Sequence, residues 1–453
     1  MSRRIEPIEL AVLAVRWAIH EGATEAEAFT LVERGYKVSL RANRISSLEV
    51  VDDAGIGIRV AVGKKLGFSY VTGLDRDSVR EAVRNAVKQA RAAPEDREWR
   101  GLPEPSPSYP EPRNMYSPAL AYMESSTVLE NAKYMLDKAL ETKGVQVVGG
   151  GTGVYIVERA VTNSNGVYRV DSGTMAFAAI DVLVQSNGIT TPAIYELSSS
   201  RVSFPSLDHV VEKAIEKAKQ CTKRAEGVTT GKYTVVLSPG VLYELLAPTV
   251  LYSLRGDIAV QGRSFYADKI GQQHLSEKIT IVDDGVLKGG DNTWRFDGEG
   301  VATSRKVLVE KGVVKGFIYD TYWGRRAGKE STGNAVRAGY ASKPSPGFTN
   351  IIVEQGDASP DELLEGRVLV IYQVQGAHTA NSDTGEYSVL ANPAILYENG
   401  EPKGWVQGAV ISGNMYKEIM NNVELVGKLV EKPYPGVYMP WIRLSEITVA
   451  TKS

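Results

Sequence analysis

Apolar residues recur at intervals of three and four residues in several stretches of the first half of the chain. Residues at this spacing share one side of an α-helix, so each stretch predicts an amphipathic helix. The expected helices cover roughly residues 5–22, 75–93, 117–143 and 207–225. In the second of them, Asp77 or Ser78 is expected to cap the N-terminus, and Pro94 is expected to end the helix.

Alternating apolar and polar residues between these helices predict β-strands joined by glycine turns. This pattern fills residues 26–73 and 145–186. The second half begins with a strand-like stretch at 231–240 and an apolar helical stretch at 241–254, and short strands dominate the remainder. The predicted fold class is therefore α+β, with N-terminal helices beside an antiparallel sheet and a C-terminal β-rich domain that is barrel-like or a sandwich.

A proline-rich connector suggests how the chain is divided. Residues 101–113, GLPEPSPSYPEPR, hold five prolines, which favour an extended linker. A chain of 453 residues also exceeds what one core normally accommodates. We expect an N-terminal α+β region at 1–110, a second α+β region of the N-terminal half at 111–227, and a β-rich domain at 228–453.

The charge balance excludes several classes of partner. The formal net charge is -2, and lysine and arginine form no long block, so neither nucleic acid nor a membrane surface is an expected partner. No apolar run approaches the roughly 20 residues that a membrane span needs. The single cysteine, Cys221, cannot form an intrachain disulfide, which favours a reducing compartment. We expect a soluble cytoplasmic protein.

Two glycine clusters are faintly similar to phosphate-binding loops. They are Gly55-Ile-Gly57 and the run from Gly149 to Gly153. A dinucleotide loop must lead into a helix, whereas strand-like sequence follows both clusters. We interpret them as turns or bulges of strands.

The histidines give no local metal motif. None of the four is four or five residues from another, the spacing at which two imidazoles of one helix bind the same zinc ion. His378 has the most suggestive neighbours, Asp383 and Glu386, and these three residues form an alternative candidate site.

Paired carboxylates occur at Asp283-Asp284 and at Asp297 with Glu299. An Asp-Asp-Gly sequence between strands is typical of a hairpin turn. No further acidic or histidine residues nearby complete a metal cage, and no GxSxG elbow supports a serine hydrolase.

An ordered series of short motifs resembles the TldD/PmbA family over nearly the whole chain. The first half contains EAEAF, GIGIRVAV, LGFSYVTG and GLPEP. The second half contains GRSFYADKIGQ, ITIVDDG, FDGEGVATSRKVLVEKGVVKGFIYDTYWGRRAG, STGNAVR, GDASPDELLE, TGEYSV, YENGEP and ISGN. No single motif is specific to the family, and the resemblance rests on the order and spacing of the motifs together.

The resemblance implies a zinc site in one branch of the family. TldD-type subunits are zinc metallopeptidases with HExxxH on a helix and a cysteine ligand near the C-terminus, and the glutamate acts as the general base. Laid on this chain without gaps, the first histidine falls on Ala247, the glutamate on Pro248 and the second histidine on Tyr252. The cysteine falls on Val426.

These four replacements remove the chemistry that the pattern needs. Alanine and valine have no electron pair to donate, and the phenol of Tyr252, with an ordinary pKa of about 10, is a poor ligand alone. Proline in a helix interior costs about 3 kcal/mol, so we expect the helix to break or restart at Pro248. Cys221 lies in a different segment. We therefore expect no catalytic residue, metal or cofactor in this chain.

In lacking the zinc ligands and the general base, this chain resembles the TldE (PmbA) branch of the family. The resemblance then implies a heterodimer with an HExxxH-bearing TldD-type paralogue that holds the zinc, with a homodimer as the alternative when the paralogue is absent. It also implies extended or unfolded peptides as substrates, bound in a channel between the subunits as an added β-strand.

Two other functions remain open from the sequence. One is an independent hydrolase whose site lies around His378. The other is a regulatory binding protein, as the older family name, modulator of DNA gyrase, suggests. The net charge argues against direct binding of DNA in the second case.

Overall fold

Long antiparallel strands form a curved sheet in the N-terminal half of the computed structural model, which describes residues 6–451. The strand order is β3-β2-β1-β4-β5, and β6 and β7 both pair with β5. The strands are β1 (Glu25–Arg41), β2 (Arg44–Val62), β3 (Lys65–Thr72), β4 (Val145–Asn163), β5 (Tyr168–Ser186), β6 (Ile189–Thr190) and β7 (Ile194–Ser200). The sheet therefore joins residues on both sides of the proline-rich connector.

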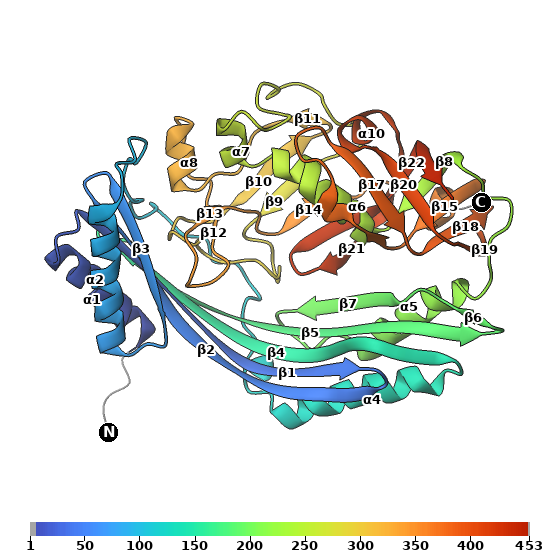
Figure 1. Ribbon diagram of the computed structural model, residues 1–453, viewed down its shortest axis with the longest axis horizontal. Helices are drawn as coiled ribbons and strands as arrows, with labels where there is room; N and C mark the ends of the chain where they lie inside the picture. The colour runs from blue at the N-terminus through green and yellow to red at the C-terminus, as the bar shows by residue number, and fades with distance from the viewer. Residues whose placement is uncertain (1–5, 452–453) are drawn as a thin grey trace.

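One face of this sheet is covered by helices. Even-numbered residues of β1 point to that face: Ala26 and Ala28 pack with α1 and α2, and Val38 and Leu40 pack with α4 and α5. Figure 1 shows α1 and α2 at one end of the curved sheet and α4 on its underside. The helices are α1 (Pro7–His20), α2 (Arg76–Ala92), α3 (Pro118–Ala121), α4 (Ser125–Glu141) and α5 (Leu207–Gln220).

The predicted helices are present, with different ends. The stretch expected at 117–143 is divided into α3 and α4, and the last helix ends at Gln220. The N-cap of α2 is Asp75, whose side chain accepts a hydrogen bond from the Ser78 N–H, so the choice of Asp77 or Ser78 is wrong. Residue 5, the expected start of the first helix, lies outside the described residues.

The C-terminal half forms a mixed sheet of 13 strands that lies over the other face of the N-terminal sheet (Figure 1). The main path is β11-β10-β9-β14-β22-β8-β15-β18-β19, in which β22 pairs in parallel with β14 and antiparallel with β8. The α+β class is confirmed, and the β-rich domain is built on one mixed sheet.

The elements of this half are short apart from its last two strands. Its strands are β8 (Gly231–Leu237), β9 (Ile281–Asp284), β10 (Arg305–Glu310), β11 (Val313–Val314), β12 (Ala335–Val336), β13 (Ser345–Pro346), β14 (Ile351–Val353), β15 (Arg367–Ile371), β16 (Val374–Gln375), β17 (Glu386–Ala391), β18 (Ala394–Glu398), β19 (Glu401–Val406), β20 (Ala409–Asn414), β21 (Val423–Tyr434) and β22 (Val437–Ala450). Its helices are α6 (Pro239–Leu246), the π-helical turn η1 (Ala247–Leu251), α7 (Gly256–Val260), α8 (Thr321–Arg326), α9 (Pro360–Leu363), the 3₁₀ turn η2 (Ala377–Thr379) and α10 (Met415–Asn421).

The glycine clusters have two different structural roles. Gly149 lies at a register shift between β4 and β5, which confirms a bulge there. Gly55 and Gly57 instead lie in the regular part of β2, where the ring and carbonyl of Tyr340 come too close for any Cβ atom. Neither a turn nor a bulge exists at Gly55 and Gly57, and that expectation is wrong.

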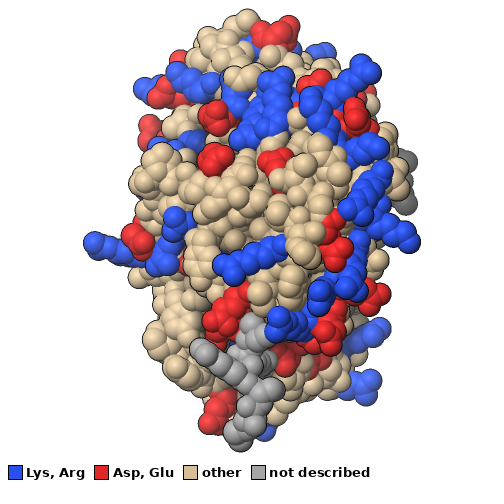
Figure 2. Space-filling view, turned by 90° about the vertical axis from the view of Figure 1, so that its left-hand side faces the viewer, with Lys and Arg blue, Asp and Glu red and all other residues tan. Residues whose placement is uncertain are grey.

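Charges of both signs are mixed on the outer surface. Figure 2 views the end of the molecule that carries α1 and α2, and basic and acidic residues lie side by side over most of it. The pair between Arg84 of α2 and Glu21 is one example. None of the helices between residues 6 and 451 is long and apolar enough to span a bilayer.

Candidate functional site

The helix that corresponds to HExxxH is continuous through its proline. Residues 239–246 are α-helical, residues 247–251 form the π-helical turn η1, and the α-helix resumes at Tyr252. Pro248 has no N–H, and its ring excludes the usual α-helical hydrogen bond to the carbonyl of Glu244. In η1 the N–H of Tyr252 donates to the carbonyl of Ala247, five residues earlier. The α-helix is therefore interrupted at Pro248 and restarts at Tyr252, as expected, but the wider turn keeps the chain helical in between.

Three of the four positions lie on one side of this helix. Tyr243, Glu244, Ala247, Pro248 and Tyr252 are all half-buried. The opposite side is packed into the core of the C-terminal domain through Leu242, Leu245, Leu246, Val250 and Leu251. The half-buried side is therefore the one that a ligand or substrate can reach.

The fourth position lies on a different element and is deeply buried. Val426 belongs to β21, where it pairs with Ile442 of β22, and only 3% of its surface is exposed. Its carbonyl accepts a hydrogen bond from the N–H of Ala358, and Gly356 packs against its Cβ atom. The side chain is part of the hydrophobic core.

The start of the helix faces the N-terminal half. Tyr434 of β21 donates a hydrogen bond to Glu244, and its ring lies 5.6 Å from that of Tyr243. Next to them is a space of about 120 Å³, which is also lined by Tyr195 and Leu197 of β7. Ala247 and Pro248 follow Glu244 by three and four residues, so they lie on the same side of the helix, one turn further on.

Charged residues surround that space. Lys213 and Lys217 of α5 both pair with Glu196 of β7, and Lys213 also pairs with Glu431 of β21. These ion pairs connect the helical layer, the N-terminal sheet and the C-terminal domain beside the start of α6.

The far end of the helix is tied to the segment that carries His378. The hydroxyl of Tyr416, in α10, is 2.6 Å from Ser253 Oγ, 3.2 Å from the carbonyl of Thr249 and 2.6 Å from the carbonyl of Ser382. The 3₁₀ turn η2, which contains His378, also packs against α6. Two regions that the sequence suggested separately are therefore neighbours in space.

Arg263 connects the same two regions from the surface. Its guanidinium carbon lies 5.7 Å from the centre of the Tyr252 ring, and its Nη2 lies 3.5 Å from a carboxylate oxygen of Asp383. His378, Asp383 and Glu386 are all exposed, and no hydrogen bond links the three among the described residues. They form an exposed rim beside the helix.

The described residues contain no group of three or more His, Cys, Asp or Glu side chains that could hold a metal ion. Cys221 lies just beyond α5, is fully buried, and burial raises the pKa of its thiol to about 12. A buried thiol with a raised pKa is a poor ligand and nucleophile. The available side chains at Ala247, Pro248, Tyr252 and Val426 fit no catalytic zinc.

The inner face of the N-terminal sheet is partly apolar. Tyr155 of β4 is paired with Met175 of β5, and Phe177 lies in register with Gly153. All three side chains are half-buried, and the Tyr155 and Phe177 rings stack with centres 6.1 Å apart. This face, defined here as the concave face, is the one opposite the helices and is covered in part by the C-terminal domain.

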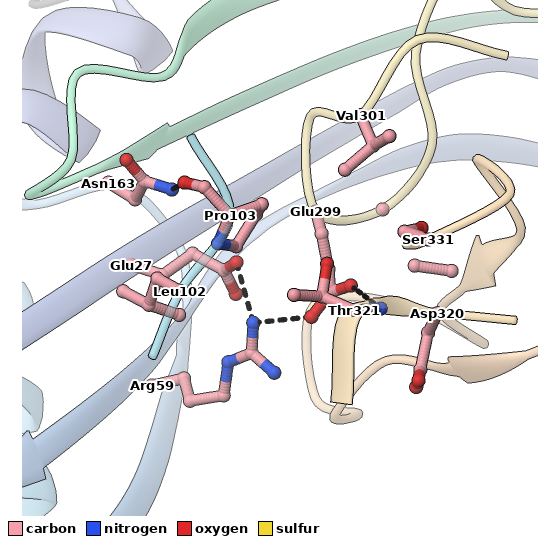
Figure 3. Close-up of polar contacts among 12 residues, drawn as sticks. Glu27, Arg59, Leu102, Pro103, Asn163, Glu299, Val301, Asp320, Thr321 and Ser331 are labelled. Atoms are coloured by element: carbon pink, nitrogen blue, oxygen red, sulfur yellow. Dashed lines mark hydrogen bonds and ion pairs between the residues drawn. The ribbon is translucent and has the colours of Figure 1, made fainter. Parts of the chain in front are cut away.

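An ionic cluster joins the two halves where they meet. Arg59 of β2 donates through Nη2 to Glu27 of β1 at 2.8 Å and to Glu299 at 2.7 Å. Glu299 also accepts from the N–H of Thr321 at 2.8 Å, and Arg337 pairs with the other oxygen of Glu27. Figure 3 shows Arg59 between the two carboxylates. The cluster is almost fully buried and fixes the C-terminal domain on the sheet.

Two other acidic residues near this cluster, Asp297 and Asp320, have pKa values well above the usual value for an aspartate. Burial and the charge of Glu299 raise the pKa of Asp297 to about 7 and that of Asp320 to about 8. Asp320 caps α8 by accepting from the N–H of Trp323. The cluster is a structural junction, because each of its members is bonded to protein groups.

The remaining acidic pair is also structural. Asp283 and Asp284 are the last residues of β9, and β10 follows only after residue 304, so the expected hairpin turn is wrong. Asp283 is completely buried and accepts from Asn334 and Thr349, with Lys306 Nζ at 3.2 Å. No local pattern indicates this burial, because the partners of Asp283 are distant along the chain.

Comparison with known proteins identifies the family. Models described as PmbA/TldA metallopeptidase domain 1, central domain and C-terminal domain match residues 26–90, 119–221 and 230–451. An uncharacterised protein of Methanocaldococcus jannaschii is 33% identical over 89% of this chain and 94% of its own length. The chain belongs to the PmbA/TldA metallopeptidase family, as its motifs predicted.

Two further relatives carry names. A metalloprotease TldD homologue of Haemophilus influenzae is 26% identical, over 88% of this chain and 86% of its own length. The crystal structure of TldE from Thermococcus kodakarensis is similar with a TM-score of 0.89 and 28% identity, over 97% of this chain and all of that one. This chain therefore shares its fold with TldE.

Proposed function

We propose that this chain is the non-catalytic, TldE-like subunit of a peptidase that degrades unfolded or extended peptides. The zinc ion of that enzyme is held by an HExxxH-bearing paralogue, and this chain lines the path of the substrate. The observation that carries the proposal is the set of side chains at Ala247, Pro248, Tyr252 and Val426, which offers neither a metal-binding pair of imidazoles nor a general base.

The concave face supports the second part of the proposal. Tyr155, Met175 and Phe177 offer half-buried apolar surface on a sheet. Glu244 of α6 lines a space that is also lined by Tyr195 and Leu197 of β7 in that sheet. Apolar side chains of an unfolded peptide bind favourably to such an apolar surface. The space beside the start of α6 is about 120 Å³, far too small for a folded domain.

Reconstitution tests the proposal. Cleavage of casein or a flexible peptide is measured for this chain, for the HExxxH paralogue, and for the two mixed at equal concentration, with zinc content determined for each. We expect no cleavage and no stoichiometric zinc for this chain alone, and cleavage by the mixture that a chelator abolishes. Stoichiometric zinc together with chelator-sensitive cleavage by this chain alone would overturn the proposal.

The two alternative functions, a hydrolase with its site at His378 and a DNA-binding regulator, have less structural support. A hydrolase centred on His378 needs a base held by a second polar group, and no hydrogen bond between His378 and Asp383 or Glu386 supports one. A DNA-binding regulator needs an excess of basic residues, whereas the chain has a formal net charge of -2, and the face in Figure 2 carries charges of both signs. The variant His378→Ala, which would abolish any activity of the lone chain under the first alternative, is expected to leave the mixture active.

A further inference from the structure

A cavity of about 230 Å³ lies between the N-terminal sheet and the C-terminal domain. The sheet contributes Phe29 of β1 and Arg159 of β4 to its wall, and the C-terminal domain contributes Trp294, Phe296 and Phe348 among others. The wall thus combines four aromatic side chains with polar groups, and it includes two arginines, Arg159 and Arg337.

The half-buried Arg159 differs in its partners from Arg59 and Arg337, two other arginines of this junction. Arg59 and Arg337 each pair with a carboxylate at close range. Arg159 has no salt bridge among the described residues, and its hydrogen bonding there is limited to the carbonyl of Phe296, to which Nη2 donates. Its Nε–H is buried without a partner. Burial lowers the pKa of Arg159 to about 9, so the side chain is still a cation at neutral pH.

Aromatic rings hold this cation in place. The guanidinium carbon of Arg159 lies 4.1 Å from the centre of the Trp294 ring and 4.8 Å from that of Phe296. Arg201 lies against the same Trp294 ring at 4.5 Å. A guanidinium fixed by stacking keeps its N–H groups in the plane of the fork, where they can bind two oxygens of one ligand.

The nearby carboxylates are already occupied. Asp171 accepts from the N–H of Arg295 and lies 3.5 Å from its side chain. Asp297, which lines the cavity, accepts backbone N–H groups of Glu299, Val301 and Ala335, and its raised pKa leaves it partly neutral near pH 7. Nη1 of Arg159 forms no hydrogen bond among the described residues, so its two N–H groups are available to a ligand.

We propose that this cavity binds a small carboxylate with an apolar or aromatic body, whose two oxygens are held by the guanidinium of Arg159 and whose body packs against Phe29, Trp294 and Phe348. Asn292 and Val336 are exposed residues of the cavity wall, so they form its entrance. This site is separate from the helix at Ala247 and does not depend on the proposed peptidase role.

Benzoate is the probe, and benzamide is its neutral control of nearly equal shape. Titration calorimetry with the full chain, in a buffer of low chloride, gives the affinity, and fluorescence of Trp294 gives a second signal that Trp294→Phe removes. We expect saturable benzoate binding, no benzamide binding, an affinity about 10- to 100-fold weaker in Arg159→Met, and an intermediate affinity in Arg159→Lys.

A second variant keeps the proposal testable even if Arg159→Met does not fold. Val336 is 40% exposed at the entrance, so Val336→Trp is expected to abolish binding by closing the cavity while leaving the unfolding temperature nearly unchanged. Absence of saturable benzoate binding to the unmodified chain would overturn the proposal. Equal affinity in Val336→Trp, or in a folded Arg159→Met, would do the same.

Discussion

Arg59 and Glu299 are 240 positions apart in the sequence, and their side chains form a 2.7 Å ion pair in which both are almost fully buried. The same Arg59 nitrogen reaches Glu27 on the neighbouring strand. One guanidinium thus links two strands of the N-terminal sheet to the loop that precedes β10. The relative position of the two halves, and with it the space beside α6, depends on this junction.

Replacing Arg59 by methionine is expected to lower the free energy of unfolding by about 3–5 kcal/mol, because Glu299 remains buried without a cation and Glu27 keeps only its pair with Arg337. Denaturant unfolding followed by circular dichroism measures the change. Arg34→Met is the control, since its pair with Asp52 is exposed and its loss is expected to cost no more than about 0.5 kcal/mol. Equal effects of the two substitutions would contradict the role of the junction.

Asp320 makes stability depend on pH in an unusual direction. Its pKa is raised to about 8 in the folded chain, against about 4 when unfolded. Between these values the folded state holds a proton that the unfolded state has released, so this group lowers stability as pH rises from about 4 to about 8. Asp320→Asn keeps a side-chain oxygen to cap α8 and removes the titration.

The variant Asp320→Asn is therefore expected to gain thermal stability over the unmodified chain progressively between pH 5 and 8. Thermal unfolding at several pH values measures the difference. Asp137→Asn, at an exposed position of α4, serves as the control with no such trend. A difference between Asp320→Asn and the unmodified chain that is constant across this range would show that Asp320 does not titrate there.

Tyr416→Phe removes the hydroxyl that bonds to Ser253, Thr249 and Ser382. We expect a loss of about 1–3 kcal/mol in the free energy of unfolding, since buried polar partners are left unpaired. Hydrogen exchange should also become faster in residues 381–385, because that segment loses its attachment to η1. Tyr122→Phe, at a side chain that is 82% exposed, should change neither quantity. Unchanged exchange in 381–385 would refute the attachment.

Tyr155→Ser removes apolar surface from the concave face. In the mixture with the HExxxH paralogue, we expect a several-fold higher KM for unfolded casein with little change in kcat, because binding is weakened and the zinc chemistry is not touched. The control is the same substitution at Tyr168, Tyr168→Ser, because Tyr168 is 55% exposed and lies on the opposite face of the same sheet. Equal KM values for the two variants would argue against binding on the concave face.

The sequence predicted the fold class and most helices because their patterns are local. Apolar periodicity places α1, α2 and α5 within a few residues of their observed ends, and alternation identifies the long strands. The cap of α2 was missed by two or three residues because several neighbouring side chains can accept the same bond. The candidate positions Ala247, Pro248 and Tyr252 came from the resemblance, and their common half-buried side became visible only in the structure.

Contacts between distant segments could not be read from the chain. Nothing local distinguishes Glu299 from an exposed turn residue, because its burial depends on Arg59 of β2 in the N-terminal sheet. The same holds for Arg263, which links Tyr252 to Asp383 through tertiary structure alone. The sequence predicts a turn or bulge at Gly57, but the position requires glycine because the carbonyl of Tyr340, in the C-terminal half, comes too close for a Cβ atom.

The hydrogen bond from the N–H of Tyr252 to the carbonyl of Ala247 sets how the side chains at positions 247 and 252 align along the helix. Five residues advance an α-helix by about 1.4 turns, so side chains at positions 247 and 252 would diverge on a regular helix. The five-residue bond of η1 instead stacks the two positions one turn apart. Under the proposed function, this is the alignment that the two imidazoles of an HExxxH helix need, and here it brings together Ala247 and Tyr252, which offer no metal-binding pair.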